Sequence, residues 1–325
     1  MTIGVMGAGA WGTALAQVLA ADGTPVRLWA RDPALVATIA AERRNPVYLP
    51  TAALSEAIRP TADLDDLAEA EMVLVVTPAQ AMRGVLRQLP QAGMPLILCS
   101  KGIEAGTMKL LHAVAAEEHP GSPIAVLSGP TFAHEVAAGL PTAVTLAAAD
   151  RDVAGPLARR IKRPSLRPYV STDVAGAEIG GAVKNVLAIA CGVVEGAGLG
   201  QNARAAVIAR GFAEMTRFGL ARGARAETLA GLSGLGDLVL TCSSTSSRNY
   251  SLGVGLGRGE PATALLADRR TVAEGAFTAP VLHDAAAAAG VDMPVAEAVC
   301  RLLGGANVGA VIEALLSRPL REEGI

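Results

Sequence analysis

Lysine is scarce in this chain, and two of its lysines lie where an ammonium group could take part in chemistry. Four of the 28 basic residues are lysine and the others are arginine. A lysine that is desolvated or placed beside another cation can lose its proton near neutral pH, which arginine cannot do. General acid/base catalysis requires this property. We therefore take Lys101 and Lys184 as candidates for proton transfer, whereas Lys109 and Lys162 fall in segments with an ordinary helical pattern.

Lys101 comes directly after an apolar run, residues 96–100, and directly before Gly102. We expect this run to be a buried strand, and ligands of open α/β sheets bind beyond the carboxyl ends of such strands. A solvated surface side chain is the ordinary interpretation of any single lysine. The strand before Lys101 and the glycine after it favour a ligand contact instead.

Lys184 lies in a segment whose apolar residues recur at helical spacing. It is one position, about 100° of helix rotation, from Val183 in the apolar stripe, so we expect it at the margin of the buried face. Gly180 and Gly181, one turn earlier, would allow another backbone or a ligand to come near. A lysine that extends to solvent from a helix edge would be the preferred interpretation of this segment alone.

Two further segments in the second half carry polar groups suited to a ligand. Asp237 stands alone in a glycine-rich and otherwise apolar run, residues 231–242, where a buried carboxylate needs a partner. Ser247, Arg248 and Asn249 supply a hydroxyl, a guanidinium and an amide in succession, which suits a phosphate. A turn rich in Ser and Asn is the alternative for this second segment, and composition does not reject it.

The chain begins with a predicted strand that runs into G-x-G-x-x-G. Gly7 would make the tight turn, Gly9 would let the backbone approach a pyrophosphate, and Gly12 would let helix and strand pack closely. A helical stretch, residues 13–21, and a second predicted strand, residues 26–30, follow the loop. This order of elements favours dinucleotide binding over a merely glycine-rich turn.

The end of the second strand bears on the choice of cofactor, because an acidic residue there holds the ribose 2′-hydroxyl whereas an arginine accommodates a 2′-phosphate. The sequence offers both, as Arg31 followed by Asp32. Arg31 lies closer to the strand end, which leans toward NADPH without excluding NADH. Asp32 is interpreted almost equally well as a helix N-cap before Pro33.

Two domains are expected to position these groups. Six apolar runs alternate with helical stretches in the first half and predict a parallel sheet covered on both faces. They are residues 2–6, 26–30, 72–77, 96–100, 124–128 and 143–147. After Asp173 apolar residues recur at helical spacing and no convincing strand follows. We expect an α/β dinucleotide-binding domain over residues 1–173 and an all-helical substrate domain over residues 174–325.

Composition limits the partners and the compartment. With 51% hydrophobic and 18% charged residues and a net charge of -2, the 325-residue chain lacks the basic excess that nucleic-acid binding needs. Residues 3–21 carry no charge, but four glycines and Gln17 interrupt them, so we do not expect a membrane span. The four cysteines show no C-x-x-C pair and no metal-ligand spacing. They suit buried positions in a reducing cytosol, and we expect a cytoplasmic protein without a bound metal.

These motifs, in this order, closely resemble those of the bacterial NAD(P)-dependent glycerol-3-phosphate dehydrogenases. The resemblance extends from the first residues to about Glu274 and rests on segments 7–12, 100–102, 129–136, 180–185, 202–205, 234–238 and 247–249. It implies a Rossmann-type doubly wound sheet with an all-α C-terminal domain. It also implies an enzyme that uses NAD(P)H to interconvert dihydroxyacetone phosphate and sn-glycerol 3-phosphate for phospholipid synthesis. Apart from the resemblance, we expect a phosphorylated small-molecule substrate, and a homodimer is the candidate assembly.

The same resemblance assigns roles to individual residues and makes Lys184 the proton donor and acceptor. The substrate contacts that it implies are Lys101, Gly129, Thr131, Lys184, Asp237, Ser247, Arg248 and Asn249. Together with the loop residues Gly7, Gly9 and Gly12, the implied cofactor contacts are Ala10, Trp11, Arg31, Lys101, Ala133, Arg248, Val272 and Glu274. Many members carry serine at position 10 and histidine at position 31, which leaves a side-chain hydrogen bond and the cofactor preference open.

The interpretation is a reductase in which the nicotinamide delivers a hydride while Lys184 protonates the carbonyl oxygen. Lys101 would polarise the carbonyl or lower the proton affinity of Lys184, Asp237 would orient one of the cations, and Arg248 would hold the phosphate. One alternative is a related dehydrogenase of a 3-hydroxy acid, which would not need the phosphate group at residues 247–249. The other is a non-catalytic sensor that binds the dinucleotide for regulation.

Overall fold

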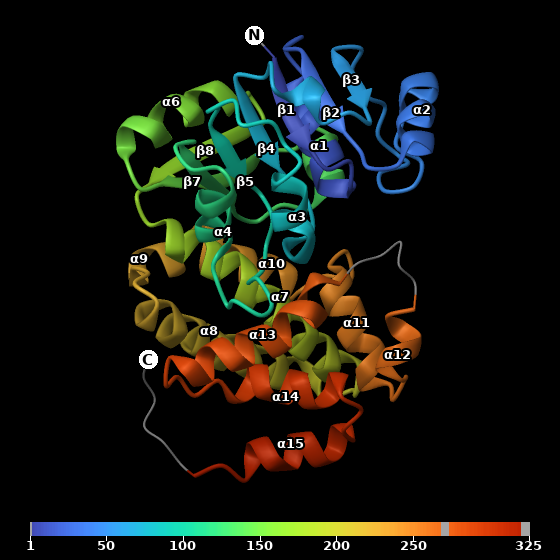
Figure 1. Ribbon diagram of the computed structural model, residues 1–325. Coiled ribbons are helices and arrows are strands. Elements are labelled where there is room, and N and C mark those ends of the chain that lie inside the picture. Colours follow the sequence, from blue (N-terminus) through green and yellow to red (C-terminus); the bar gives the residue numbers. More distant parts are fainter. Residues whose placement is uncertain (1, 268–272, 320–325) are drawn as a thin grey trace. The chain divides into compact units, whose positions relative to one another are not determined.

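The computed structural model describes residues 2–267 and 273–319 (Figure 1). Contacts between residues divide the chain into two compact units, which we call unit 1 and unit 2. Unit 1 consists of Met1–Ser100 and Leu111–Val174, and unit 2 of Lys101–Leu110 and Ala175–Ile325. Residues 101–110 thus belong to unit 2, although they lie inside the range expected for the first domain.

Unit 1 contains, within its described residues, an eight-stranded sheet in the order β3-β2-β1-β4-β5-β6-β7-β8. The strands are β1 Ile3–Met6, β2 Val26–Trp29, β3 Ile58–Thr61, β4 Met72–Val75, β5 Leu96–Leu98, β6 Ile124–Ser128, β7 Thr142–Ala148 and β8 Leu166–Ser171. β1 pairs in parallel with both β2 and β4, so the strand order reverses at β1. This is the switch point of a doubly wound sheet, where the loop after β1 meets a ligand. The expected fold class is confirmed.

From the sequence we expected a parallel sheet, and this expectation is wrong for one pair of strands. β7 pairs with β6 in antiparallel orientation, and β8 then runs parallel to β7. The connection between β6 and β7 contains only the five-residue helix α5, Ala133–Ala137. So short a helix does not return the chain to the starting end of the sheet, which a parallel crossover requires.

Two strands, β3 and β8, were missed because each contains a proline. Pro60 lies in β3 and Pro168 in β8, and these strands form the two edges of the sheet. Proline lacks an N–H group, which argues against a central strand but is tolerated at an edge. The proline therefore indicated the position of these strands in the sheet and not their absence.

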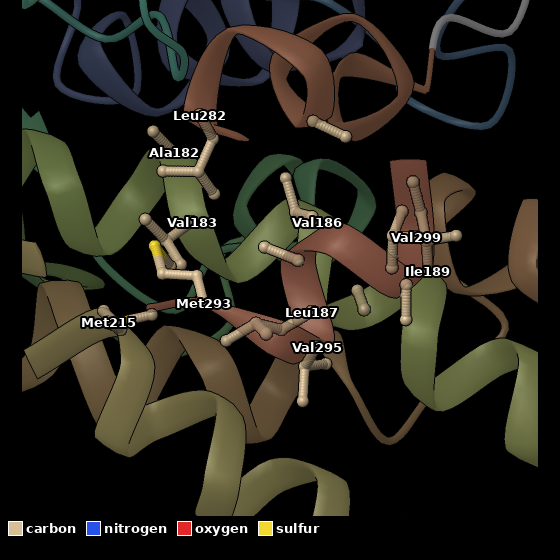
Figure 2. Packing of buried hydrophobic residues seen from close by; sticks show 14 of the residues in the cluster. Ala182, Val183, Val186, Leu187, Ile189, Met215, Leu282, Met293, Val295 and Val299 are labelled. Carbon is tan, nitrogen blue, oxygen red and sulfur yellow. The ribbon is translucent and has the colours of Figure 1, made fainter. Parts of the chain in front are cut away.

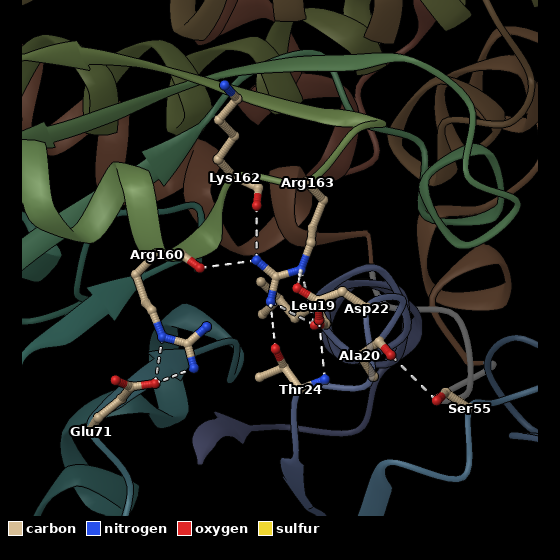
Figure 3. Close-up of polar contacts among 9 residues, drawn as sticks. All are labelled: Leu19, Ala20, Asp22, Thr24, Ser55, Glu71, Arg160, Lys162 and Arg163. Atoms are coloured by element: carbon tan, nitrogen blue, oxygen red, sulfur yellow. Dashed lines mark hydrogen bonds and ion pairs between the residues drawn. The ribbon is translucent and has the colours of Figure 1, made fainter. Parts of the chain in front are cut away.

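The helices of unit 1 lie between these strands. They are α1 Ala10–Leu19, α2 Pro33–Glu42, α3 Met82–Leu86, α4 Leu111–Glu118, α5 and α6 Arg151–Ile161. α1 packs against α5 and α3 packs against α4. Arg163 links the end of α6 to α1, because its guanidinium donates to the Leu19 carbonyl at 2.8 Å and to the Thr24 hydroxyl at 3.2 Å (Figure 3). Buried hydrogen bonds of this kind hold the helix after the glycine loop in place.

Unit 2 is helical, and no strand follows β8 in the described part of the chain. Its helices are α7 Val174–Gly196, α8 Gly200–Ala221, α9 Ala226–Leu229, η3 Leu232–Gly236, α10 Asp237–Thr241, α11 Arg248–Gly257, α12 Ala262–Leu265, α13 Glu274–Ala288, α14 Pro294–Leu303 and α15 Val308–Leu316. Residues 176–189 of α7 are all buried, and Val183, Leu187 and their neighbours pack against Met215 of α8, Leu282 of α13 and Val295 of α14 (Figure 2). α7 is thus the central helix of this unit.

α7 also meets the length and composition criteria for a membrane-crossing helix, the one helix among the described residues that does so. In its most apolar window 94% of the residues are buried inside the protein. A core helix passes the same criteria, because a helix surrounded by other helices is apolar on all sides. The apolar stretch that we considered from the sequence, residues 3–21, forms β1, the glycine loop and α1 instead.

Candidate functional site

Three charged side chains of unit 2 meet in one buried cluster. Lys184 Nζ lies 2.6 Å from Asp237 Oδ1, and Lys101 Nζ lies 2.7 Å from Asp237 Oδ2. The Asp237 side chain is 0% exposed, that of Lys184 7% and that of Lys101 16%. The structure therefore brings together the two lysines and the isolated carboxylate that the sequence had singled out. The two ammonium groups thus share the carboxylate of Asp237, each through one of its oxygens.

Lys184 was expected at the margin of the buried face of its helix, and the structure places it elsewhere. α7 is buried around its whole circumference at this level, so Lys184 lies in the interior of unit 2 and does not extend to solvent. The other two lysines also differ from expectation, because Lys109 lies in the loop before α4 and Lys162 is the C-cap residue of α6. Lys184 is thus a buried helix lysine, whose charge must be balanced within the protein.

Burial lowers the pKa of the Lys184 ammonium from its usual 10.5 to about 8, because the charged form is desolvated. Asp237 opposes this effect and raises the pKa of Lys184, whereas the positive charge of Lys101 lowers it further. A hydrogen bond with Cys191 and burial raise the pKa of the nearby Cys242 thiol, so that side chain is neutral. Lys184 can therefore exist as ammonium or as amine near neutral pH, which suits a general acid/base.

Thr241 is a fourth member of the cluster that the sequence analysis did not identify. Lys184 Nζ donates to Thr241 Oγ1 at 2.8 Å, and the same hydroxyl lies 3.3 Å from Asp237 Oδ1. Asp237 and Thr241 are four residues apart at the two ends of α10, so they share one helix face. This spacing is the signal that could have revealed Thr241. Its hydroxyl restricts the direction of the Lys184 ammonium.

Glycines allow the segment that carries Asp237 to pack directly on α7. Residues 232–236 form a π-helical turn, a rare element that is frequent at functional sites. A Cβ atom on Gly180 would lie 2.3 Å from the Ser233 carbonyl oxygen, and one on Gly234 would lie 1.8 Å from the Leu229 carbonyl oxygen. Only glycine permits these approaches, and for Gly180 the expected close backbone contact is confirmed. The turn thereby brings Asp237 within reach of Lys184.

The three consecutive residues Ser247, Arg248 and Asn249 lie at the start of α11. The Ser247 hydroxyl caps this helix by accepting from the Tyr250 N–H at 3.2 Å, and Arg248 is exposed. Asn249 Nδ2 donates to Asn185 Oδ1 at 3.0 Å. Asn249 thus bridges to the residue next to Lys184, and the segment combines a helix N-terminus with an exposed guanidinium.

The glycine loop in unit 1 has the expected backbone geometry. Gly7 has a φ of 126°, and a Cβ atom on Gly12 would lie 1.8 Å from the Gly7 carbonyl oxygen. Gly7 therefore makes the turn, and Gly12 allows helix and strand to pack, as predicted. A Cβ atom on Gly9 would meet no atom within 4 Å, so the space beside this residue is open. α1 begins directly after Gly9, with its first N–H groups available to an anion.

Four buried polar atoms of unit 1 have no hydrogen-bond partner among the described residues. One of them, Arg43 Nε, lies 3.5 Å from the Glu56 carboxylate, and the other three need a different explanation. These three are Trp11 Nε1, Thr77 Oγ1 and Ser128 Oγ. They follow or end β1, β4 and β6, which run in the same direction in the sheet. Unpaired buried polar groups are rare in native proteins and call for an explanation. A polar ligand at the carboxyl edge of the sheet provides one, and these residues fit a nicotinamide dinucleotide.

The remaining predicted contacts are distributed over both units. In unit 1, Arg31 is exposed, and Asp32 is the N-cap of α2, accepting from the Ala34 N–H at 2.9 Å. Gly129 has a φ of 151° after β6, Thr131 donates to the Gly129 carbonyl, and Ala133 begins α5. In unit 2, Glu274 begins α13 and is half-buried, whereas Val272 lies outside the described residues. Among the described residues no cluster of His, Cys, Asp and Glu could hold a metal ion.

A doubly wound sheet with a glycine loop, joined in one chain to a helical unit with a buried lysine–carboxylate site, defines a nicotinamide dinucleotide-dependent dehydrogenase. Comparison with known families identifies which one. The family described as NAD-dependent glycerol-3-phosphate dehydrogenase N-terminus matches residues 2–154, and the corresponding C-terminus family matches residues 173–313. The chain therefore belongs to the NAD(P)-dependent glycerol-3-phosphate dehydrogenase family.

Individual relatives agree with this assignment. Glycerol-3-phosphate dehydrogenase (NAD(P)+) 1 of Sphingopyxis alaskensis is 65% identical, covering 99% of this chain and 98% of that protein. The corresponding protein of Erythrobacter litoralis is 64% identical, covering 99% and 97%. The crystal structure of glycerol-3-phosphate dehydrogenase from Coxiella burnetii has a TM-score of 0.93 at 39% identity and covers 98% of this chain and 99% of that one. The protein is thus an oxidoreductase that uses NAD(P).

Proposed function

We propose that the protein reduces dihydroxyacetone phosphate to sn-glycerol 3-phosphate, with Lys184 as the general acid and, in the reverse direction, the general base. Membership of the family supports the substrate. The observation that carries the role of Lys184 is its burial at 2.6 Å from Asp237 Oδ1 with a pKa lowered to about 8. An ammonium with this pKa gives up a proton more readily than an ordinary lysine, and the resulting amine can take it back.

When bound, the reduced nicotinamide supplies the hydride that forms the new C–H bond at the ketone carbon. Lys184 donates one proton to the carbonyl oxygen, which becomes the hydroxyl of the product, and the lysine is left as a neutral amine. Lys101 places a second ammonium beside Asp237 and stabilises negative charge that develops on the oxygen. Asp237 and Thr241 hold the Lys184 Nζ atom in one direction and keep it from rotating away.

For the phosphate of the substrate we propose the start of α11. Arg248 supplies an exposed guanidinium, and Ser247 and Asn249 supply a hydroxyl and an amide beside it. Guanidinium–phosphate pairs are among the stronger hydrogen-bonded contacts, and a helix N-terminus favours an anion. Gly129 and Thr131 of unit 1 remain proposed substrate contacts.

For the cofactor we propose the glycine loop and a set of individual residues. The glycine loop, Gly7 to Gly12, would hold the pyrophosphate at the start of α1, with Ala10 and Trp11 beside it. The other proposed contacts are Arg31, Lys101, Ala133, Arg248, Val272 and Glu274. The exposed Arg31 after β2 suits a 2′-phosphate, which favours NADPH while leaving NADH as a substrate.

We also propose a cytoplasmic homodimer that supplies glycerol 3-phosphate for glycerophospholipid synthesis. Free cysteines, with no disulfide in the described part of the chain, support a reducing compartment. Sedimentation of the purified protein tests the dimer, and a single species with the mass of one chain would contradict it. Glycerol 3-phosphate dependence of a strain that lacks the gene tests the biosynthetic role, and growth without the supplement would contradict it.

The reaction is tested by following the oxidation of NADH and of NADPH in the presence of dihydroxyacetone phosphate. We expect turnover with this substrate and none with unphosphorylated dihydroxyacetone or a 3-keto acid. These two compounds lack the phosphate that Arg248 is proposed to bind. Turnover of the 3-keto acid instead would indicate the related hydroxy-acid dehydrogenase. A protein that binds the dinucleotide but is inert with every keto substrate would be a sensor.

A further inference from the structure

A buried asparagine lies directly beside the glycine loop, and neither the motif nor the proposed reaction assigns it a role. Asn45 is 0% exposed and belongs to the segment between α2 and β3. Its Nδ2 group donates to the Ala8 carbonyl and to Thr13 Oγ1, both at 2.8 Å, and its Oδ1 accepts from the Tyr48 N–H at 3.1 Å. All hydrogen-bonding groups of this amide are therefore used, and two of them act on the loop and on the helix that follows it.

We propose that Asn45 is a positioning residue for the dinucleotide, which fixes the peptide between Ala8 and Gly9 in the orientation that receives the phosphates. This inference rests on the cofactor-binding role proposed for the glycine loop. It extends that role to a residue 33 positions after the end of the motif.

The geometry of the peptide bond connects Asn45 with the ligand side of the loop. The peptide bond between Ala8 and Gly9 is trans, since no cis peptide bond occurs among the described residues. The Ala8 carbonyl and the Gly9 N–H therefore point in opposite directions across one planar unit. Because Asn45 holds the carbonyl on the protein side, the Gly9 N–H faces away from Asn45. The space beside Gly9 is open, as a ligand approach requires.

The Ala8 carbonyl depends on Asn45 more than on its other neighbour. The Thr13 hydroxyl also donates to this carbonyl, but at 3.4 Å, near the limit for a hydrogen bond, against 2.8 Å for Asn45. Ala8 is flanked by two glycines, which have more conformational freedom than any other residue. Without Asn45 the buried carbonyl would lose its main donor, and the peptide could rotate toward another one.

The segment that carries Asn45 is fastened by other residues as well, which provides a matched control. Gln17 on α1 accepts from the Ser55 N–H at 2.8 Å, and the Ser55 hydroxyl donates to the Ala20 carbonyl at the end of α1 (Figure 3). Gln17 thus links the same helix to the same segment without touching the glycine loop. A Gln17→Leu variant loosens the segment and leaves the donor to Ala8 in place.

The test measures the dissociation constants of NADH and NADPH by nicotinamide fluorescence, together with kcat, the KM for dihydroxyacetone phosphate and the melting temperature. We expect Asn45→Leu to raise both nucleotide dissociation constants about tenfold, the effect of one lost buried hydrogen bond. At saturating nucleotide we expect kcat and the KM for the ketone to stay within about threefold of wild type, because the chemistry in unit 2 is untouched. Gln17→Leu should lower the melting temperature but leave nucleotide affinity within about twofold.

Two outcomes would overturn the inference: nucleotide affinity unchanged in Asn45→Leu, or equally weakened in Gln17→Leu, which would indicate general packing. If Asn45→Leu does not fold, Asn45→Ser carries the same expectation, because the shorter side chain does not reach the Ala8 carbonyl. A Gly9→Ala variant separates this inference from the proposed role of the loop. If Gly9→Ala binds nucleotide normally, the loop is not the binding site and that proposal fails, whatever Asn45 does.

Discussion

The glycine loop of unit 1 and the lysine–aspartate cluster of unit 2 are built on opposite principles. The loop lies within six consecutive residues and owes its properties to missing side chains, because a Cβ atom on Gly12 would overlap a backbone oxygen. The cluster consists of charged side chains that are 136 and 53 residues apart, held together in an apolar interior. The proposed binding region thus depends on backbone shape, whereas the proposed chemistry depends on a balance of buried charges.

Removal of the Asp237 charge is expected to have the largest effect on stability. In Asp237→Asn the two ammonium groups lose the carboxylate that they share, and breaking a buried ion pair such as that of Lys184 costs about 3–5 kcal/mol of unfolding free energy. Lys184 can relieve this cost by losing its proton, so its pKa should fall below about 8. Urea unfolding measures the first effect, and the pH dependence of kcat for reduction measures the second.

Lys101→Met should shift the pKa of Lys184 in the direction opposite to Asp237→Asn. Lys101 lowers the pKa of Lys184, so its removal should raise that pKa and move the loss of reductase activity to higher pH than in wild type. Asp237→Asn should move the loss of reductase activity to lower pH than in wild type. A shift in the same direction for both variants would contradict the charge balance described for this cluster.

In the glycine loop of unit 1, the addition of a single methyl group should already disturb the backbone. Gly12→Ala places a Cβ atom 1.8 Å from the Gly7 carbonyl oxygen, so the loop must shift, at a cost of about 1–3 kcal/mol. Nucleotide binding should be lost with the loop geometry, as titration calorimetry can measure. Gly9→Ala is the control, since its methyl group meets no protein atom: stability should be unchanged while nucleotide affinity falls. Equal stability of Gly12→Ala and wild type would refute the close packing.

The smallest effect is expected from a buried carboxylate of unit 2 outside the lysine cluster. Glu214 accepts from the Val295 and Ala296 N–H groups at the start of α14, and burial raises its pKa from 4.5 to about 7. The folded protein therefore binds a proton that the unfolded chain releases at lower pH. Stability should fall by about 1 kcal/mol as the pH rises from about 6 to 8 through this pKa.

Glu214→Gln removes this titration and should flatten the dependence of unfolding free energy on pH. Denaturant unfolding at several pH values measures it, with Glu313→Gln as the control because that side chain is exposed. If the Glu214→Gln curve keeps the slope of wild type, another group causes the pH dependence.

The two regions also differ in how far they could be predicted from sequence. The glycine loop and the sheet order around it follow local rules, since turn, strand and helix signals lie side by side in the chain. Lys101, Lys184 and Asp237 could be proposed one by one from their surroundings, but no local rule joins residues so far apart. Thr241 was missed because a threonine in an apolar helix usually packs without a special role. Asn45 was missed because an asparagine between a helix and a strand resembles an ordinary turn residue.

The resemblance of the motifs to a known family supplied the roles that local patterns could not. The edge strands and the reversal at β7 show the limit of those patterns. Proline in β3 and β8 concealed both strands, and the direction of β7 depends on how far the five-residue helix α5 carries the chain. Such features are decided by the geometry of connections rather than by the composition of a strand.

The central claim is that Lys184 transfers the proton, and the kcat for dihydroxyacetone phosphate reduction by Lys184→Arg tests it most directly. Arginine keeps the positive charge but does not release a proton near neutral pH. We predict that kcat falls by about 10²- to 10⁴-fold, the usual contribution of a general acid, while the dissociation constant of NADPH stays near that of wild type. A Lys184→Arg enzyme that turns over within about fivefold of wild type would contradict the assignment.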